Sequence, residues 1–316
     1  MSGTIRVGTS GWSYPAGHGT WNGIFYPVPP GRRSRAGGAF DELRFYAEHF
    51  DTVEINSTFY GVPAPGTVKG WVERTPADFE FSLKLYQKFT HPKMFEKATG
   101  KDPWNLGQKD VDEFRTAIDP LLAAGKLGAL LAQFPQSFRN DPDAVGYVEW
   151  LLDRFRDYPI ALELRHKSWS DQPVETLKLL DAFGAAWAQI DEPKFRFSIR
   201  QNLLPNVRTF YYLRLHGRNA AQWWSHDKSE DRYNYLYSAD ELKPFAEAAR
   251  EATREVKKAY LYANNHFSAK SVANAAILKH DLGQPLPGVY PPEFVERYPD
   301  LKGLVRVLPD PSRKPS

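Results

Sequence analysis

Residues 160–165 read Ile-Ala-Leu-Glu-Leu-Arg and residues 211–216 read Tyr-Tyr-Leu-Arg-Leu-His, and both stretches indicate the same kind of strand. In each, a short apolar run ends in charged or polar side chains. Near-continuous apolar runs are typical of strands that are buried on both faces of a parallel sheet. About eight such strands predict an α/β fold, a TIM-like (β/α)8 barrel. The full set comprises residues 5–10, 52–56, 79–84, 129–133, 160–165, 186–191, 211–216 and 260–264.

Helical patterns alternate with these strands, as βαβ units require. The sequence predicts helices over residues 40–47, 111–124, 143–155, 174–183, 240–256 and 271–282. No convincing helix pattern separates Asp191 from Thr209, so we expect the sixth helix to be degenerate or absent. Neither a repeat nor a linker interrupts the chain. This predicts one domain over residues 1–316, whose Pro-rich end, residues 283–316, wraps around the outside of the barrel.

The loops that follow the strands are longer than those that precede them. The connection at residues 49–51, from a helix to the next strand, is short. Barrel active sites lie at the C-terminal ends of the strands, and long loops there usually carry function. The sequence therefore predicts a functional site on this face. The long strand-to-helix segments are residues 11–39, 85–109 and 217–238.

The composition excludes several classes of protein. The chain has no cysteine, which excludes disulfides, thiolate catalysis and cysteine-bound metals. No apolar run approaches the roughly 20 residues of a membrane span. The first residues show no signal-peptide core, so we expect a cytoplasmic protein. The net charge of +3 is small, whereas dedicated nucleic-acid binders usually show a basic stripe. We interpret the densest basic run, residues 32–35, as a solvated loop, with phosphate contact as the alternative.

Polar side chains at the strand ends define the candidate site. Because strand side chains alternate between faces, Glu54 shares a face with Asn56, and Arg214 shares one with His216. An unpaired buried charge costs several kcal/mol, so such a group forms either a wet functional pocket or a closed ion-pair network. We favour the pocket because its members come from several strands at matching depth. The members are Glu54, Asn56, Lys84, Gln133, Glu163, Arg165, Asp191, Arg214, His216 and Asn264.

We predict three catalytic residues in this pocket. Glu54 and Glu163 would form an acid/base pair, and His216 would join them because histidine titrates near neutral pH. Their structural alternatives are salt bridges for the glutamates and a hydrogen-bonded core position for the histidine. Cations would hold an anionic group and amides would bind hydroxyls. The predicted substrate-binding residues are Ser10, Trp12, Asn56, Lys84, Gln133, Arg165, Asp191, Arg214, Asn264, Asn265 and His266.

A divalent metal and an aromatic surface are further alternatives. Carboxylate and imidazole groups that Mg, Mn or Zn accept occur at Glu163, Asp191, His216 and His266, but no metal-binding spacing accompanies them. The cofactor therefore stays undetermined. Aromatic side chains near the strand ends would either stack on sugar or base rings or form a hydrophobic lid, which is the simpler interpretation. They are Trp12, Tyr14, Trp21, Phe25, Tyr26, Phe59, Tyr60, Trp169, Trp223 and Trp224.

Several longer motifs connect these residues in order along nearly the whole chain. They include Gly8-Thr9-Ser10-Gly11-Trp12-Ser13-Tyr14, Val53-Glu54-Ile55-Asn56-Ser57-Thr58-Phe59-Tyr60, Phe81-Ser82-Leu83-Lys84, Gln133-Phe134-Pro135, Glu163-Leu164-Arg165-His166, Arg214-Leu215-His216-Gly217 and Asn264-Asn265-His266. Together they resemble the YecE-like family, domain of unknown function 72. The resemblance implies a TIM-like barrel and a relation to sugar isomerases, without an established reaction. Residues 28–38 and roughly 97–110 look like insertions relative to that family.

Three functions are open at this stage. The first, which we favour, is an enzyme that isomerises or hydrolyses a sugar or sugar phosphate; Glu163→Gln should then abolish turnover with little loss of stability. The second is a metal-dependent nucleic-acid enzyme or binder, similar to the barrel-type apurinic endonucleases. The third is a non-catalytic metabolite-binding protein, since fold alone never implies activity. The sequence does not indicate the oligomeric state.

Overall fold

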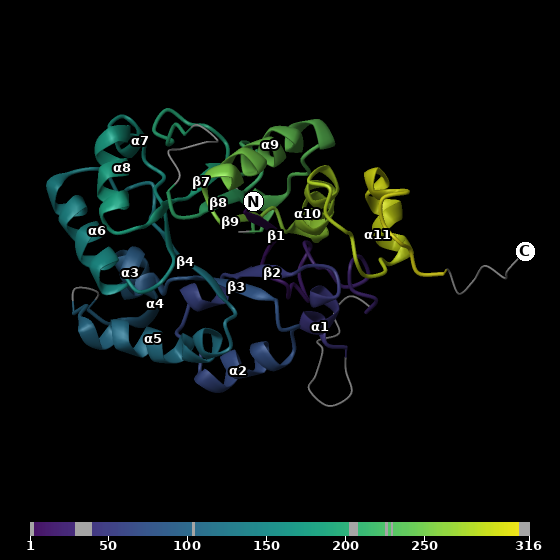
Figure 1. The fold of residues 1–316 in the computed structure, drawn as a ribbon, viewed down its shortest axis with the longest axis horizontal. Coiled ribbons are helices and arrows are strands. Elements are labelled where there is room, and N and C mark those ends of the chain that lie inside the picture. Colours follow the sequence, from purple (N-terminus) through teal and green to yellow (C-terminus); the bar gives the residue numbers. More distant parts are fainter. Residues whose placement is uncertain are drawn as a thin grey trace, which may run out of the picture.

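The predicted barrel is present. The computed structural model describes residues 3–28, 40–102, 105–201, 208–224, 227–228 and 230–309. All strand pairs in its single sheet are parallel, in the order β6-β5-β4-β3-β2-β1-β9-β8-β7 (Figure 1). The strands are β1 (Thr4–Ser10), β2 (Thr52–Ile55), β3 (Glu80–Lys84), β4 (Leu127–Gln133), β5 (Ile160–Glu163), β6 (Ala186–Trp187), β7 (Gln189–Asp191), β8 (Tyr211–Leu215) and β9 (Lys258–Ala263).

The sheet closes through the sixth apolar run, which is interrupted. Its first half, β6, pairs with β5, and its second half, β7, pairs with β8. Ala188, between the halves, still donates its backbone N–H to Leu162 O at 2.9 Å. One predicted strand thus accounts for two strands of the sheet. Both ends of the sheet lie in this run, so the ring of strands closes there.

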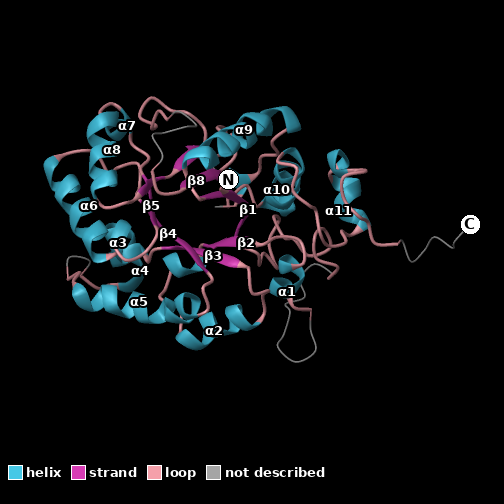
Figure 2. Cartoon of the chain, in the orientation of Figure 1, coloured by secondary structure: helices cyan, strands magenta, loops and turns pink. Residues whose placement is uncertain are grey.

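Helices surround the ring, and most lie within three residues of the predicted bounds (Figure 2). The sequence did not predict α2, α3, α4, α7 or α11. Between β7 and β8 the described residues 192–201 and 208–210 form no helix, as expected. The helices are α1 (Glu42–Ala47), α2 (Pro65–Glu73), α3 (Gln87–Thr90), α4 (Pro92–Thr99), α5 (Gln108–Ala123), α6 (Pro142–Arg154), α7 (Lys167–Ser170), α8 (Pro173–Ala182), α9 (Ala239–Glu255), α10 (Lys270–Asp281) and α11 (Pro292–Arg297).

The barrel interior is filled rather than hollow. Small side chains such as Ala129 and Ala161 face the rings of Tyr212, Tyr260 and Tyr262, and together they form a separate buried cluster. A buried phenol needs a hydrogen-bond partner, and these find one across the barrel. Tyr262 OH bonds to Ser82 Oγ at 2.9 Å, Tyr260 OH to Glu80 at 2.5 Å, and Tyr212 OH to Glu54 at 2.7 Å. This tyrosine layer is the floor beneath the candidate site.

The segment after Gly283 packs outside the barrel, beside the first helices. Tyr290 and Phe294 contact Phe25 from the first long loop, and Tyr290 also meets His49 after α1. The helix α11 lies outside α10 (Figure 1). Among the described residues, no helix has both the length and the apolar character needed to cross a bilayer. The basic run at residues 32–35 lies outside the described residues.

Candidate active site

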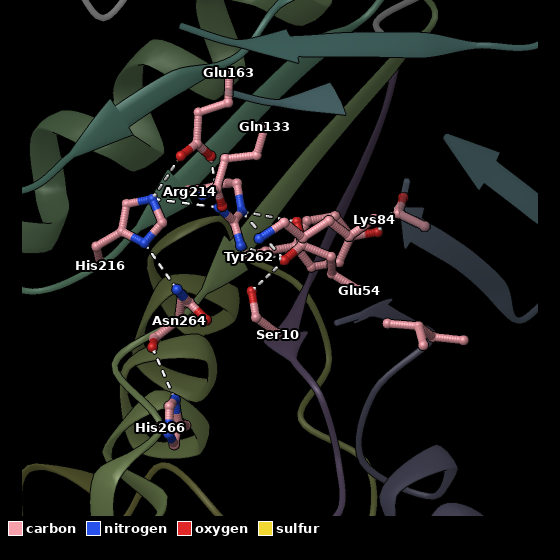
Figure 3. Close-up of polar contacts among 12 residues, drawn as sticks. Ser10, Glu54, Lys84, Gln133, Glu163, Arg214, His216, Tyr262, Asn264 and His266 are labelled. Atoms are coloured by element: carbon pink, nitrogen blue, oxygen red, sulfur yellow. Dashed lines mark hydrogen bonds and ion pairs between the residues drawn. The ribbon is translucent and has the colours of Figure 1, made fainter. Parts of the chain in front are cut away.

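Arg214 on β8 is the centre of a buried ion-pair layer above the tyrosines. Its Nη2 lies 2.7 Å from Glu54 Oε1, and its Nη1 lies 2.6 Å from Glu163 Oε2. Nη1 also donates to Gln133 Oε1 at 3.0 Å. Arg214 is 1% exposed and both carboxylates are fully buried. Figure 3 shows the two glutamates on opposite sides of the guanidinium. The predicted assembly of strand-end charges therefore exists, and its central members are paired.

Glu54 has its acceptor sites occupied. Besides Arg214, its Oε1 accepts from Ser10 Oγ at 2.7 Å and its Oε2 from Tyr212 OH at 2.7 Å. These contacts hold the carboxylate group in one position. These contacts favour a role in which Glu54 holds Arg214 in place. Ser10, a predicted ligand-binding residue, is fully buried and supports Glu54.

Glu163 holds a second guanidinium. Arg165 approaches its Oε1 through Nε at 2.6 Å and Nη2 at 2.5 Å. Burial alone would raise the pKa of Glu163, but Arg165, Arg214 and His216 together hold this pKa well below its usual range. The carboxylate is therefore ionised at neutral pH. As with Glu54, the contacts favour positioning of cations over proton transfer.

Glu192 is a member of the site that the sequence analysis missed. It follows β7 directly, is 1% exposed, and lies 3.4 Å from Arg165 Nη1. Neither carboxylate oxygen has a hydrogen-bond partner among the described residues. Burial raises the pKa of Glu192, only partly opposed by Arg165. The sequence offered one signal for Glu192. It directly follows Asp191 and is therefore a second acidic residue at the end of the same strand run.

His216 is held as a neutral imidazole. Its Nε2 faces Arg165 Nη2 at 3.1 Å, and its Nδ1 lies 2.8 Å from the amide of Asn264. A guanidinium can only donate, so Nε2 is the acceptor of the contact with Arg165. The atom of Asn264 that faces Nδ1 is Nδ2. Burial, with Arg165 and Arg214 nearby, lowers the pKa of His216 to about 3 despite Glu163. His216 thus orients Arg165 and is not charged at neutral pH.

Lys84 differs from the other cations because it lacks a carboxylate. It ends β3 and lies half-buried, with Nζ 3.9 Å from the centroid of the Phe59 ring. The described residues provide Nζ with neither a hydrogen bond nor an ion pair. Burial and the neighbouring Arg214 and Arg165 lower the pKa of Lys84 to about 7, although Glu163 and Glu54 oppose this. In Figure 3 the side chain reaches toward the centre where Arg214 and Glu54 meet.

Aromatic side chains border one side of this polar centre. His266 stacks on Tyr14 with ring centroids 4.4 Å apart, and its other neighbour is Tyr233 at 4.8 Å. Trp223 continues the row at 6.4 Å from both Tyr233 and His216. Burial lowers the pKa of His266 to about 4. The row provides flat ring surfaces on which a ring could stack; Tyr14, Tyr233 and His266 are half-buried and Trp223 is buried.

Other predicted aromatic residues belong to the hydrophobic lid instead. Trp21, Phe25 and Tyr26 are fully buried in the outer core. Trp12 is half-buried and packs edge-on against Trp71 of α2, 5.9 Å between centroids. The first long loop therefore forms the predicted hydrophobic lid, apart from Tyr14.

Two predicted ligand-binding residues lie away from the centre. Asp191 accepts from Arg218 Nε at 2.8 Å and from Tyr237 OH at 2.7 Å, at the edge of the barrel. Asn265 is fully buried and donates to Tyr235 O at 2.8 Å and to Asn274 at 2.7 Å. Both residues anchor the long loop before α9.

Asn56 is the remaining predicted residue, and it lies one position past the end of β2. It precedes the 3-10 turn η1 (Ser57–Phe59), and its backbone O accepts from Phe59 N at 3.1 Å. Its side chain is half-buried. This turn carries Phe59 into contact with Lys84.

The predicted metal-ligand set is not assembled. Asp191 is bound to Arg218, and His266 stacks on Tyr14, so neither joins Glu163 and His216. In the part of the chain that the structure describes, no three His, Asp or Glu side chains are grouped to hold a metal ion. The set therefore fails as a chelating site because its members face different neighbours.

One cavity is lined by residues of α3 and α6. It has a volume of about 570 Å³, and its wall includes Lys88 and Phe89 of α3, Phe138, and Tyr147 and Trp150 of α6. Its lining does not include Glu54, Glu163, Arg165 or Arg214. We place the site at the barrel mouth because the charged groups converge there.

Comparisons with known proteins agree with the motifs. A family model described as protein of unknown function DUF72 matches residues 6–296. This chain belongs to the DUF72 family. It is 28% identical over 277 residues to the UPF0759 protein YunF of Bacillus subtilis strain 168, which covers 85% of this chain and 92% of YunF.

Solved structures of DUF72 proteins share the fold. One from Thermotoga maritima MSB8 has a TM-score of 0.72 and 33% identity, and covers 89% of this chain and 100% of its own. One from Enterococcus faecalis V583 has a TM-score of 0.74 and 26% identity, and covers 89% and 96%. The predicted resemblance to the YecE-like family is thereby confirmed.

Proposed function

We propose that this DUF72 protein is an enzyme that acts on a sugar or sugar phosphate at the C-terminal mouth of the barrel. The observation that carries the proposal is the Lys84 amine, which has no carboxylate or hydrogen-bond partner among the described residues, beside the fully paired Arg214 and Arg165. A buried ion-pair layer is weak evidence for stability, because apolar residues of similar size often serve as well. A layer that fixes cations around a reactive amine is better explained by ligand chemistry.

The geometry supports separate roles for the two levels of the site. The lower level, Glu54, Glu163 and Arg214, is rigid and fully bonded. The upper level carries groups with free capacity, including Lys84 and the half-buried Gln133. Lys84 would bind an anionic or developing negative oxygen, or exchange a proton near neutral pH. The row of Tyr14, His266, Tyr233 and Trp223 would contact the apolar face of a sugar ring.

Calorimetry with named probes tests this proposal. We expect ribose 5-phosphate or fructose 6-phosphate to bind more tightly than the parent sugars and inorganic phosphate. Lys84→Met should weaken binding at least tenfold, whereas Lys243→Met, at an exposed ion pair on α9, should not. Equal binding by the Lys84→Met variant would contradict the proposed site.

Turnover separates an enzyme from a binding protein. In deuterated water, NMR should show exchange of a sugar C–H proton or formation of an isomer or hydrolysis product by the wild type. Binding without either change would favour a non-catalytic metabolite-binding protein. Binding to abasic duplex DNA with a steep salt dependence, in the absence of sugar binding, would favour the nucleic-acid alternative.

A further inference from the structure

The Lys84 amine stands apart from other buried or half-buried lysines of the chain. Lys126 Nζ donates to Val72 O, Thr75 O and Thr75 Oγ1 at 2.8–3.0 Å, which uses all three ammonium donors. Lys88 Nζ lies 2.6 Å from Asp110 Oδ1. These contacts hold both lysines as bound ammonium groups. Among the described residues, the partner of Lys84 Nζ is only the face of the Phe59 ring.

The surroundings of Lys84 favour a neutral amine. The nearby carboxylates, Glu54 and Glu163, already bind guanidinium groups, while Arg214 and Arg165 repel an added positive charge. A lysine that is desolvated beside another cation is the usual form of an amine nucleophile. The charged and titratable groups that face Lys84 are Glu54 on β2, His91 after α3, Glu163 and Arg165 on or after β5, and Arg214 on β8.

We propose that Lys84 forms an imine with a carbonyl carbon of the substrate, which makes the substrate class an aldose or ketose, or its phosphate, in the open-chain form. This inference rests on the proposed function and assigns its reacting group. Position supports it, because β3 ends at Lys84 and the side chain reaches toward Arg214 and Glu54 (Figure 3).

The covalent step balances without an added oxidant or reductant. Lys84 Nζ attacks the carbonyl carbon, the C=O π electrons move to oxygen, and the proton lost from nitrogen passes to that oxygen to give a carbinolamine. With a further proton from solvent, the C–O bond breaks, water leaves, and the nitrogen lone pair completes a protonated C=N bond. The imine withdraws electrons from the adjacent carbon, which eases loss of its proton, as isomerisation requires.

Reductive trapping tests the proposal. We would incubate the full chain with dihydroxyacetone phosphate and sodium cyanoborohydride, then map the modified peptide by mass spectrometry. We expect one secondary amine at Lys84, with a labelling rate at least tenfold above those of Lys126 and Lys88. The rate should rise with pH through a midpoint near 7, since burial and the guanidinium groups lower the pKa of Lys84 to about 7.

Two variants separate imine chemistry from simple binding. Lys84→Arg keeps a cation, so it should retain binding of sugar phosphates but lose trapping and turnover; its melting temperature reports whether it folds. Lys88→Arg should be trapped like the wild type. Equal labelling of exposed lysines, or no label at Lys84, would overturn the imine. If Lys84→Arg still turns over sugar phosphate, the imine fails while the proposed function stands. If the wild type neither binds nor converts these sugars, the proposed function itself fails.

Discussion

Removal of the negative charge of Glu163 should destabilise the fold, not only the chemistry. Glu163→Gln preserves the shape of the side chain but removes the charge that both guanidiniums share. Arg165 lies 2.5 Å and Arg214 2.6 Å from its oxygens, and none of the carboxylate is exposed. After the change, Arg214 would retain Glu54, while Arg165 would face only Glu192 at 3.4 Å.

The magnitude follows from burial. Breaking a buried ion pair by removing one partner costs about 3–5 kcal/mol. Unfolding entropy is about 2.1 cal/mol/K per residue, or about 0.66 kcal/mol/K for this chain length. We therefore expect Glu163→Gln to lower the melting temperature by about 5–8 °C, measured by calorimetry at pH 7. The sequence alone predicted little loss of stability, so this measurement separates the two interpretations.

Two further variants make the test specific. Asp157→Asn breaks an ion pair of ordinary length, 3.0 Å to Arg115, at a carboxylate that is 75% exposed. Exposed pairs contribute roughly 0–1 kcal/mol, so this control should change the melting temperature by at most about 2 °C. The double variant Glu163→Gln with Arg165→Gln removes one charge of each sign and should recover part of the loss. A melting temperature for Glu163→Gln equal to that of the control would contradict a stabilising role for the Glu163 charge.

Three other outcomes follow from the same contacts. Tyr212→Phe leaves Glu54 Oε2 without its 2.7 Å donor and should cost about 1–3 kcal/mol in urea unfolding; an unchanged midpoint would contradict this. Burial lowers the pKa of His216 to about 3, so below about pH 6.5 the unfolded chain binds a proton that the native state does not, and stability should fall with decreasing pH by up to about 1.4 kcal/mol per pH unit. His216→Gln should flatten that dependence between pH 6 and 4, and an unaltered slope would argue against a neutral His216. Gly8→Ala would place Cβ 2.2 Å from Thr52 O, which should separate β1 from β2 and markedly reduce soluble, folded protein relative to Gly66→Ala, where a Cβ meets nothing within 4 Å.

Local patterns predicted most of the fold because strand runs and helix caps are local signals. The helix α2 was missed because its sequence, Pro-Gly-Thr-Val-Lys-Gly-Trp-Val-Glu, contains two glycines that lower helix propensity. Packing of Val68 and Trp71 on the barrel supports it instead. The break at Ala188 was also unpredictable, since it depends on pairing with two different strands.

The candidate site was predicted less completely for a related reason. Alternation of faces correctly brought Glu54, Glu163 and Arg214 together. It failed over the interrupted sixth run: Ala186 and Ala188 join the interior cluster, whereas Ile190 packs in the outer core. Asp191 pairs with Arg218 at the barrel edge, and Glu192 takes a place beside Arg165.

Pairing of charges is the property that a single sequence does not reveal, and here it determines the chemistry. Lys84 ends β3, Arg214 lies one residue before the end of β8, and both face the interior, so periodicity treats them alike. Because the guanidiniums take the nearby carboxylates at 2.5–2.7 Å, the amine is left beside positive charge. The reactivity of Lys84 is then a property of the whole layer. A substitution at Glu54 or Glu163 removes a carboxylate from this layer. It would shift the protonation of Lys84, although neither glutamate is proposed to bind the substrate.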